Sequence, residues 1–229
     1  MSALRAERGM TLVETLIAMV IGVLISLAVF SLVDFTMRRS GEIAGRVDAD
    51  QRGRLAMDAI TRQLRSQVCQ VSGTPPMYSR AGNTTDGANA TFFVDLSDGS
   101  NATQAAEMHT LAFDSTKHQI VERDYTATQP TDPSVDPTYS ATPARTRTLL
   151  SDVYQVNATP VFQYYNFAGA QLAAPVTGAN LGSIAAIQIT FDAVPPRGRV
   201  GDRGSVVFQD RISVREVDPN AADPEPECA

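Results

Sequence analysis

Few side chains in this sequence could carry enzymatic or metal chemistry. The two histidines, His109 and His118, lie at opposite ends of one predicted hairpin, where satisfied surface histidines are expected rather than metal ligands. Asp132 and Asp136 share a loop and could bind calcium, but they lack the EF-hand spacing, so a solvated loop is the simpler interpretation. The chain has no G-x-S-x-G, H-E-x-x-H, Walker A or G-x-G-x-x-G motif. We therefore expect no catalytic residue, no cofactor and no metal site.

The loop at residues 197–204 carries three arginines among its glycines. It could contact DNA or anionic lipid, although an exposed hairpin connection needs no such partner. The whole chain is acidic, with 19 basic and 25 acidic residues and a formal net charge of −6. Because binding to phosphates requires clustered cations, nucleic acid is not an expected partner.

Length and composition indicate a folded chain. The 229 residues suffice for one domain or two small ones, and the 43 % hydrophobic content can form a core, which excludes collagen-like and wholly disordered chains. The two cysteines, Cys69 and Cys228, allow at most one internal disulfide. Since neither belongs to a C-x-x-C pair, the common structural-zinc frameworks are excluded.

An apolar segment at residues 10–33 contains one charged residue, Glu14. As a helix it would span about 36 Å at ~1.5 Å per residue, enough to cross a hydrocarbon core of ~30 Å. A carboxylate in such a segment costs up to ~2.5–3.5 kcal/mol, so Glu14 either has a partner or reaches the headgroups from the helix start. The sequence therefore predicts a transmembrane helix here.

Two features of this segment leave alternatives open. Arginines stand on both sides of it, so the positive-inside rule does not decide its orientation. Residues 26–28 could also serve as the small-residue cleavage site of a secretory signal peptide, but the apolar run continues beyond them to Val33.

The run at residues 8–18, RGMTLVETLIA, resembles the type III signal of type IV prepilins and type II secretion pseudopilins. In that family a short basic leader ends in glycine, and a membrane peptidase cuts after the glycine and methylates the new N-terminus. The resemblance implies cleavage between Gly9 and Met10 and methylation of Met10, a large apolar residue where the family usually has phenylalanine. Glycine suits a narrow peptidase cleft because it has no side chain and few backbone limits.

After this cleavage Glu14 becomes the fifth residue of the mature chain. The resemblance implies that its carboxylate pairs with the N-terminal amine of a neighbouring subunit and fixes the axial register of a filament. The implied partners are other pilin or pseudopilin subunits through this helix, the prepilin peptidase, the inner-membrane assembly platform and, before assembly, membrane lipid. The chain would cross the inner membrane once, with its N-terminus in the cytoplasm and its head outside, and then enter a pilus or pseudopilus.

The helix is predicted to run from Thr11 to about Gln70, because no proline occurs before Pro75 and apolar residues recur at three- and four-residue steps. Its second half is amphipathic, with a stripe formed by Met57, Ile60, Leu64 and Val68. Three glycines weaken it by ~1 kcal/mol each and could mark bends or close approaches of a neighbour; they are Gly41, Gly45 and Gly53.

Antiparallel strands are predicted after this helix, with loops at 71–90 and 126–144. The predicted strands are 91–96, 109–114, 119–125, 145–150, 161–166, 187–192 and 206–214. A long helix followed by strands is an α+β order, that of the pilin fold, in which the helix packs on an antiparallel sheet. Three segments resemble the head of PilW-type minor pilins and J-type minor pseudopilins: residues 160–169, the predicted strand 187–192 and the last predicted strand, 206–214.

Five segments are expected: a cleaved leader at 1–9, a transmembrane and filament-core half-helix at 10–33, an amphipathic half-helix at 34–70, a β-rich head at 71–217 and an acidic, proline-rich tail at 218–229. The implied export of the head to an oxidising compartment favours a disulfide between Cys69 and Cys228, which would hold the tail to the helix. Two free thiols, or a bridge to another subunit, are the alternatives.

These observations predict a non-enzymatic structural subunit, a minor pilin or pseudopilin, that helps initiate or joins a type IV pilus or type II secretion pseudopilus. A single-pass membrane-anchored extracytoplasmic binding or sensor domain is the alternative, and a secreted hydrolase is a third hypothesis. Gly9 together with Glu14 favours the first of these over the other two.

Overall fold

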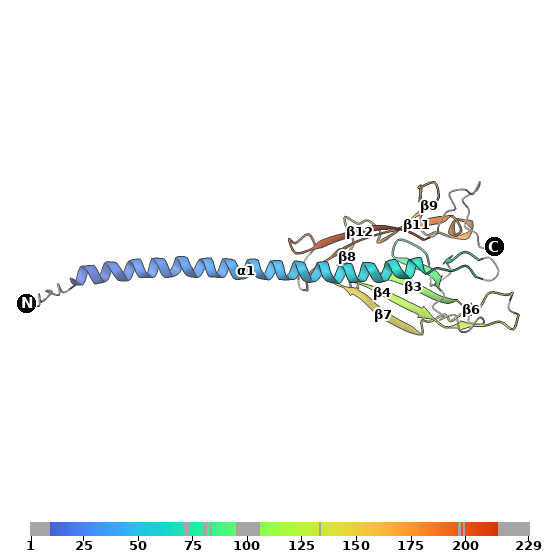
Figure 1. Ribbon diagram of the computed structural model, residues 1–229, viewed down its shortest axis with the longest axis horizontal. Helices are drawn as coiled ribbons and strands as arrows, with labels where there is room; N and C mark the ends of the chain where they lie inside the picture. The colour runs from blue at the N-terminus through green and yellow to red at the C-terminus, as the bar shows by residue number, and fades with distance from the viewer. Residues whose placement is uncertain are drawn as a thin grey trace, which may run out of the picture. The chain divides into compact units, whose positions relative to one another are not determined.

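The computed structural model describes residues 10–70, 74–79, 82, 84–94, 106–132, 134–196, 198 and 200–214. The chain divides into two compact units, Met1–Ala44 and Gly45–Ala229. One helix, α1 (Leu12–Arg65), contributes residues to both units, and the described strands all belong to the second (Figure 1).

The first unit consists, in its described part, of the N-terminal portion of α1, which includes the apolar segment, and the two residues before it. The helix starts directly after Thr11, whose Oγ1 accepts a hydrogen bond from the Glu14 N–H at 3.3 Å. This bond satisfies one of the amides that the first turn of a helix leaves without an intrahelical acceptor. All described residues of this unit are exposed, so backbone hydrogen bonding and helix propensity, rather than burial, hold this part of the helix.

The portion of α1 in the second unit is amphipathic, as predicted. Its buried side is formed by Ala49, Gly53, Ala56, Met57, Ile60 and Leu64, which recur at steps of one to four residues along one face. Ile60 and Leu64 are fully buried. The apolar stripe therefore positions this part of the helix against the sheets.

The helix ends at Arg65, and the prediction that it extends to Gln70 is wrong. The Ser66 N–H donates to the carbonyls of Arg62 and Gln63 at 3.2 and 3.1 Å. Gln67 then forms an isolated antiparallel bridge with Val94. Since a bridged residue has an extended backbone, the helix cannot continue through it.

Two antiparallel sheets make up most of the second unit. The first has the order β1-β2-β3-β4-β7 and comprises β1 (Met77–Tyr78), β2 (Asn89–Val94), β3 (Glu107–Asp114), β4 (Gln119–Tyr125) and β7 (Arg145–Ser151). The second has the order β10-β9-β11-β12, with β8 also paired to β11, and comprises β8 (Val153–Tyr154), β9 (Phe162–Asn166), β10 (Gln171–Leu172), β11 (Ile184–Ala193) and β12 (Val206–Ser213). A short 3-10 helix, η1 (Gly178–Leu181), precedes β11.

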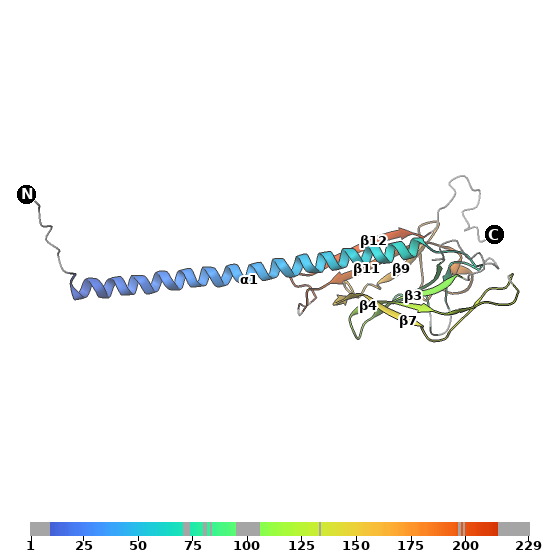
Figure 2. The ribbon, with the colours of Figure 1, turned by 60° about the horizontal axis from the view of Figure 1, so that its bottom comes forward.

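The main core lies where the helix and both sheets meet. Ile60 and Leu64 of α1 share one buried cluster with Leu111 and Ile120 of the first sheet and with residues of the second sheet, among them Phe191. Within this unit the helix runs between β11 and β12 on one side and β3, β4 and β7 on the other in Figure 1, and in Figure 2 β12 and the group of β3, β4 and β7 again lie on opposite sides of it. This helix-on-sheet packing confirms the predicted α+β class and is consistent with the pilin fold.

The predicted loops contain short strands that the sequence did not indicate. Residues 126–144 hold a two-stranded ribbon of β5 (Ala127–Thr128) and β6 (Thr138–Tyr139), and β1 lies in the predicted loop 71–90. A two-residue strand is too short for its side chains to display a period of two, so no alternation marks it.

Of the three glycines singled out from the sequence, Gly53 is the one at which α1 lies closest to the second sheet. A Cβ built on Gly53 would overlap the ring of Phe208 in β12, whereas one built on Gly41 meets nothing within 4 Å. The Phe208 ring is itself stacked on Phe191 with the ring centroids 5.4 Å apart, so it has little room to move away. Close approach, not a bend, therefore explains this glycine.

We expect Gly53→Ala to lower the stability of the head, because overpacking of a filled site costs about 1–3 kcal/mol while alanine returns about 1 kcal/mol of helix propensity. Thermal unfolding of the full chain in detergent measures the difference. Gly41→Ala is the matched control, since it gains the same propensity in open space. A Gly53→Ala chain as stable as the Gly41→Ala chain would contradict this packing.

Candidate functional site

The first candidate site is the start of α1, where the sequence places Met10 and Glu14. Met10 is exposed, and Glu14 lies in the first turn with its own N–H bonded to Thr11. Gly9 lies outside the described residues. The carboxylate of Glu14 is exposed, so within one chain this end of the helix presents an unburied acid beside apolar side chains.

The hydroxyl groups of the apolar helix bond back to its own backbone. Ser26 Oγ donates to the Gly22 carbonyl at 2.8 Å, Ser31 Oγ to Ala28 at 2.9 Å, and Thr36 Oγ1 to Leu32 at 2.8 Å. A side chain that satisfies its hydrogen-bonding capacity within its own helix can enter an apolar environment at lower cost. These polar residues are therefore compatible with a membrane-spanning helix.

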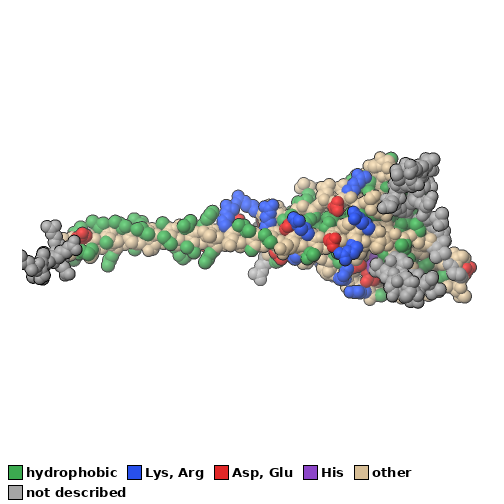
Figure 3. All heavy atoms as spheres, viewed as in Figure 1, with side chains coloured by type: hydrophobic (Ala, Val, Ile, Leu, Met, Phe, Trp, Pro, Cys, Tyr) green, Lys and Arg blue, Asp and Glu red, His purple; other side chains and the backbone are tan. Residues whose placement is uncertain are grey.

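The helix is also long and apolar enough to cross a membrane. Among the described residues it is the one helix that meets this criterion, and none of its most apolar 18-residue window is buried. Hydrophobic side chains cover this part of the helix in Figure 3. Large exposed apolar surfaces mark sites that contact membranes or other proteins.

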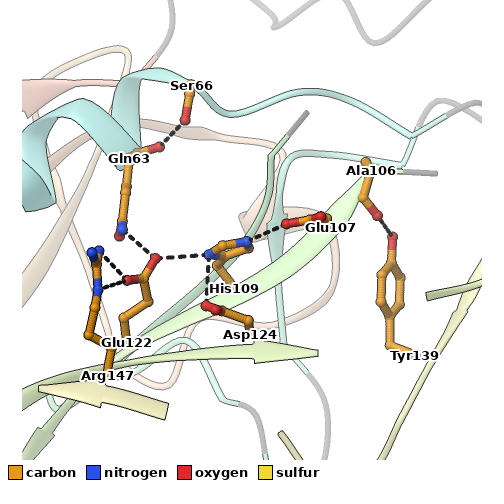
Figure 4. A network of polar contacts seen from close by, with 9 residues as sticks. All are labelled: Gln63, Ser66, Ala106, Glu107, His109, Glu122, Asp124, Tyr139 and Arg147. Carbon is orange, nitrogen blue, oxygen red and sulfur yellow. Dashed lines mark hydrogen bonds and ion pairs between the residues drawn. The ribbon is translucent and has the colours of Figure 1, made fainter. Parts of the chain in front are cut away.

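The second candidate site is a polar cluster in the head, centred on His109 (Figure 4). The ring contacts carboxylates on three sides: Nδ1 lies 3.1 Å from Oε1 of Glu122 and 3.2 Å from Oδ1 of Asp124, and Nε2 lies 3.2 Å from Oε2 of Glu107. Adjacent strands position these groups, because Glu107 and His109 are two residues apart on β3 and Asp124 on β4 is paired directly with His109.

Neighbouring elements hold Glu122 in place. Arg147 of β7 donates to its Oε2 from Nε at 2.9 Å and from Nη2 at 2.6 Å. Gln63 of α1 donates to its Oε1. The side chains of His109 and Glu122 are each 5 % exposed, whereas that of Asp124 is 25 % exposed. Glu122 thus connects the helix, the central strands and the edge strand of the first sheet.

Charge and burial act in opposite directions on these groups. Burial by itself lowers the pKa of His109, but hydrogen bonds to Glu122 and Glu107 and the charge of Asp124 outweigh it and raise that pKa. Burial likewise favours a higher pKa for Glu122, but His109 and Arg147 outweigh burial and lower it. The pKa of Asp124 is raised, chiefly by burial and despite the charge of His109. The cluster therefore favours a charged His109 and a charged Glu122.

The prediction of two surface histidines is wrong for His109. It shares the parity of Leu111 and Phe113 on β3, so its side chain is directed into the covered face of the sheet. Glu107, His109 and Leu111 occupy alternate positions, and this spacing could have indicated that His109 lies on the same face as the apolar Leu111. A histidine judged by its residue type alone is instead expected at the surface. His118 lies in the turn, half-buried, with its ring stacked on Tyr154 at a centroid distance of 4.2 Å.

The other residues considered from the sequence have structural contacts or lie outside the described part. Asp132 accepts hydrogen bonds from the N–H and hydroxyl of Ser134 at 2.9 and 2.7 Å, and Asp136 accepts one from the Thr74 hydroxyl at 2.5 Å. Cys69 is disulfide-bonded. Three further residues lie outside the described residues: Arg197, Arg199 and Cys228.

Comparison with known families identifies one match. Residues 4–30 match the model of the prokaryotic N-terminal methylation motif. No curated protein matches the chain. The matched residues include the glycine, the glutamate and most of the apolar segment from which the resemblance was inferred, so the chain carries a type IV prepilin-like signal at its N-terminus.

Proposed function

We propose that this chain, a pilin- or pseudopilin-like precursor by its N-terminal signal, is a non-enzymatic structural subunit of a type IV pilus or type II secretion pseudopilus. A single observation carries the proposal. The methylation motif at 4–30 includes the start of α1, and the described apolar residues of this helix up to Ala44 are all exposed. An apolar helix without partners in its own chain requires lipid or other helices around it.

The mass of the mature N-terminus tests this function. Cleavage between Gly9 and Met10 followed by methylation gives a chain that starts at methylated Met10. A purified chain that still begins at Met1 would contradict the proposal and favour a membrane-anchored binding or sensor domain, and a start at Val29 would indicate a secreted protein.

The proposed role extends to partners and location. The prepilin peptidase would process the chain at the cytoplasmic side of the inner membrane, and the assembly platform would then transfer it to the filament, where α1 contacts neighbouring subunits. The head would lie outside. The resemblance of residues 160–169 and the two predicted strands after them supports a minor subunit of the PilW or J type. The segments at 1–9, 10–33, 34–70, 71–217 and 218–229 would act as leader, membrane and filament half-helix, amphipathic half-helix, head and tail.

We propose further that Cys69 is paired with Cys228. Cys69 is disulfide-bonded, and Cys228 is the other cysteine of the chain. The proposed export of the head to an oxidising compartment supports the persistence of such a bond. In the chain-entropy model, closing the loop between Cys69 and Cys228 contributes on the order of 4–5 kcal/mol to the stability of the folded chain. The bond would tie the C-terminal tail to the segment that follows α1.

Glu14 is proposed to serve assembly rather than membrane insertion. We expect Glu14→Ala to insert at least as well as the wild type, because the change removes a charge that costs up to ~2.5–3.5 kcal/mol in the bilayer. Incorporation into filaments should fall, because the neighbouring terminal amine loses its partner. Quantifying the chain in membrane and sheared-filament fractions separates the two effects.

Asp34→Ala provides the control for this experiment. Asp34 also lies on the exposed helix, but its carboxylate is paired with Arg38 of the same helix at 3.0 Å. We expect this variant to enter filaments normally. Equal incorporation of the Glu14→Ala and wild-type chains would rule out the register role of Glu14.

A further inference from the structure

We propose that His109, Glu122 and Asp124 form a binding site for one zinc ion in the head. The site would use Nδ1 of His109 and one carboxylate oxygen each from Glu122 and Asp124. It does not depend on the assembly role of the N-terminal helix, because the three residues belong to adjacent strands of the first sheet.

The spacing of the ligand atoms suits a small tetrahedral ion. The candidate atoms of the three residues all lie within 4.8 Å of one another, and Nδ1 is 3.1 and 3.2 Å from the two oxygens. Zinc bonds to nitrogen and oxygen are about 2.0–2.2 Å long, so two ligands of a tetrahedral ion lie about 3.3 Å apart. The two distances from Nδ1 therefore match those between the ligands of a zinc ion.

A single proton on Nδ1 of His109 satisfies the two neighbouring carboxylates incompletely. One N–H on Nδ1 can be directed at a single acceptor, and the hydrogen bond is made with Oε1 of Glu122. Oδ1 of Asp124 is buried and ion-paired with the same nitrogen at 3.2 Å, but it accepts no hydrogen bond. Since buried polar atoms are normally hydrogen-bonded, the ion pair alone satisfies this oxygen incompletely. An ion between the three groups would bind both oxygens and the nitrogen at once.

The surrounding residues have the arrangement of outer partners in metal sites. Glu107 accepts from Nε2 of His109 at 3.2 Å, which leaves Nδ1 available as the ligand atom. Histidines that bind metals usually donate their other ring N–H to a carboxylate or carbonyl in this way. Arg147 and Gln63 hold the Glu122 carboxylate from the opposite side.

The donor set favours zinc. One imidazole and two carboxylates suit zinc with water in the fourth position, whereas calcium and magnesium prefer six or more oxygen ligands. Three carboxylates surround His109; Arg147 is bonded to Glu122, and the charge of Arg145, paired with Asp124 across the strands, acts on that carboxylate. The partly exposed Asp124 offers a path for entry.

Zinc retention by the untagged full chain in detergent tests the proposal. Protein stripped with EDTA is incubated with zinc chloride and desalted, and bound zinc is measured by atomic emission. We expect about one zinc per chain for the wild type and for His118→Gln, which removes the only other histidine. His109→Gln should retain no zinc, and Asp124→Asn should bind at least about tenfold more weakly.

Cobalt provides a second measurement that depends on the ligands. Co²⁺ in a tetrahedral site with nitrogen and oxygen ligands absorbs visible light, and we expect this absorption in the wild type and His118→Gln but not in His109→Gln. Circular dichroism establishes that each variant is folded. If His109→Gln does not fold, Asp124→Asn decides, because its side chain is partly exposed. A wild type that retains no zinc, or an Asp124→Asn chain that binds zinc as tightly as the wild type, would overturn the proposal.

Discussion

A chain with Gly9→Val is expected to stay in the membrane as the unprocessed precursor, with its leader still attached. The resemblance to prepilins places the peptidase cut after this glycine, and the family match covers the same residues. A β-branched side chain at this position adds bulk and restricts the backbone where the cleft accepts a residue without a side chain. Methylation follows cleavage, so the variant should also lack methylated Met10 and should be absent from filaments.

Mass spectrometry of membrane-extracted protein measures this directly, since the processed and unprocessed chains differ by the leader. Gly22→Val is a suitable control because it places the same side chain within the apolar helix, where a Cβ would meet nothing within 4 Å in the chain. We expect the Gly22→Val chain to be cleaved normally. A Gly9→Val chain of mature size would exclude the prepilin mechanism.

The elements with long, regular patterns could be predicted from the sequence. β4 has the predicted bounds, Gln119–Tyr125, because its apolar and polar residues and the turn before it are clear. The amphipathic part of α1 was also predicted, since its stripe repeats over several turns. The helix end was missed because Val68 continues the apolar spacing, while the bridge of Gln67 to Val94 depends on residues distant in sequence.

The two candidate sites differ in how far the sequence reveals them. The N-terminal signal is local, so the types and spacing of a few consecutive residues were enough to indicate it. The head cluster is formed by pairing: Asp124 is opposite His109, and Glu122 is opposite Arg147 in the next strand. Such contacts depend on strand register, and a shift of one residue would move each side chain to the other face of the sheet.

Glu122→Ala is expected to destabilise the head by about 3 kcal/mol. Removing one partner of a buried ion pair typically costs 3–5 kcal/mol, because the remaining charge stays buried without compensation. Glu122 is bonded to His109, Arg147 and Gln63, and the 5 % exposed His109 ring would lose a carboxylate that faces it. We expect the lower end of the range because the Arg147 side chain is 49 % exposed and can be hydrated again.

Asp58→Ala is the control that shows whether burial or the N–O distance determines the stability lost when the carboxylate is removed. The Asp58–Arg62 pair has the same closest N–O distance as the Glu122–Arg147 pair, 2.6 Å, but its side chains are 67 % and 78 % exposed. Exposed pairs of this kind contribute about 0–1 kcal/mol, because water solvates the separated charges. Urea unfolding of both variants, with EDTA present so that bound metal does not contribute, compares them directly. Similar losses in the two variants would mean that the buried cluster does not stabilise the head more than a surface pair. A loss confined to Glu122→Ala would show that burial, rather than the N–O distance, determines the cost of removing the carboxylate.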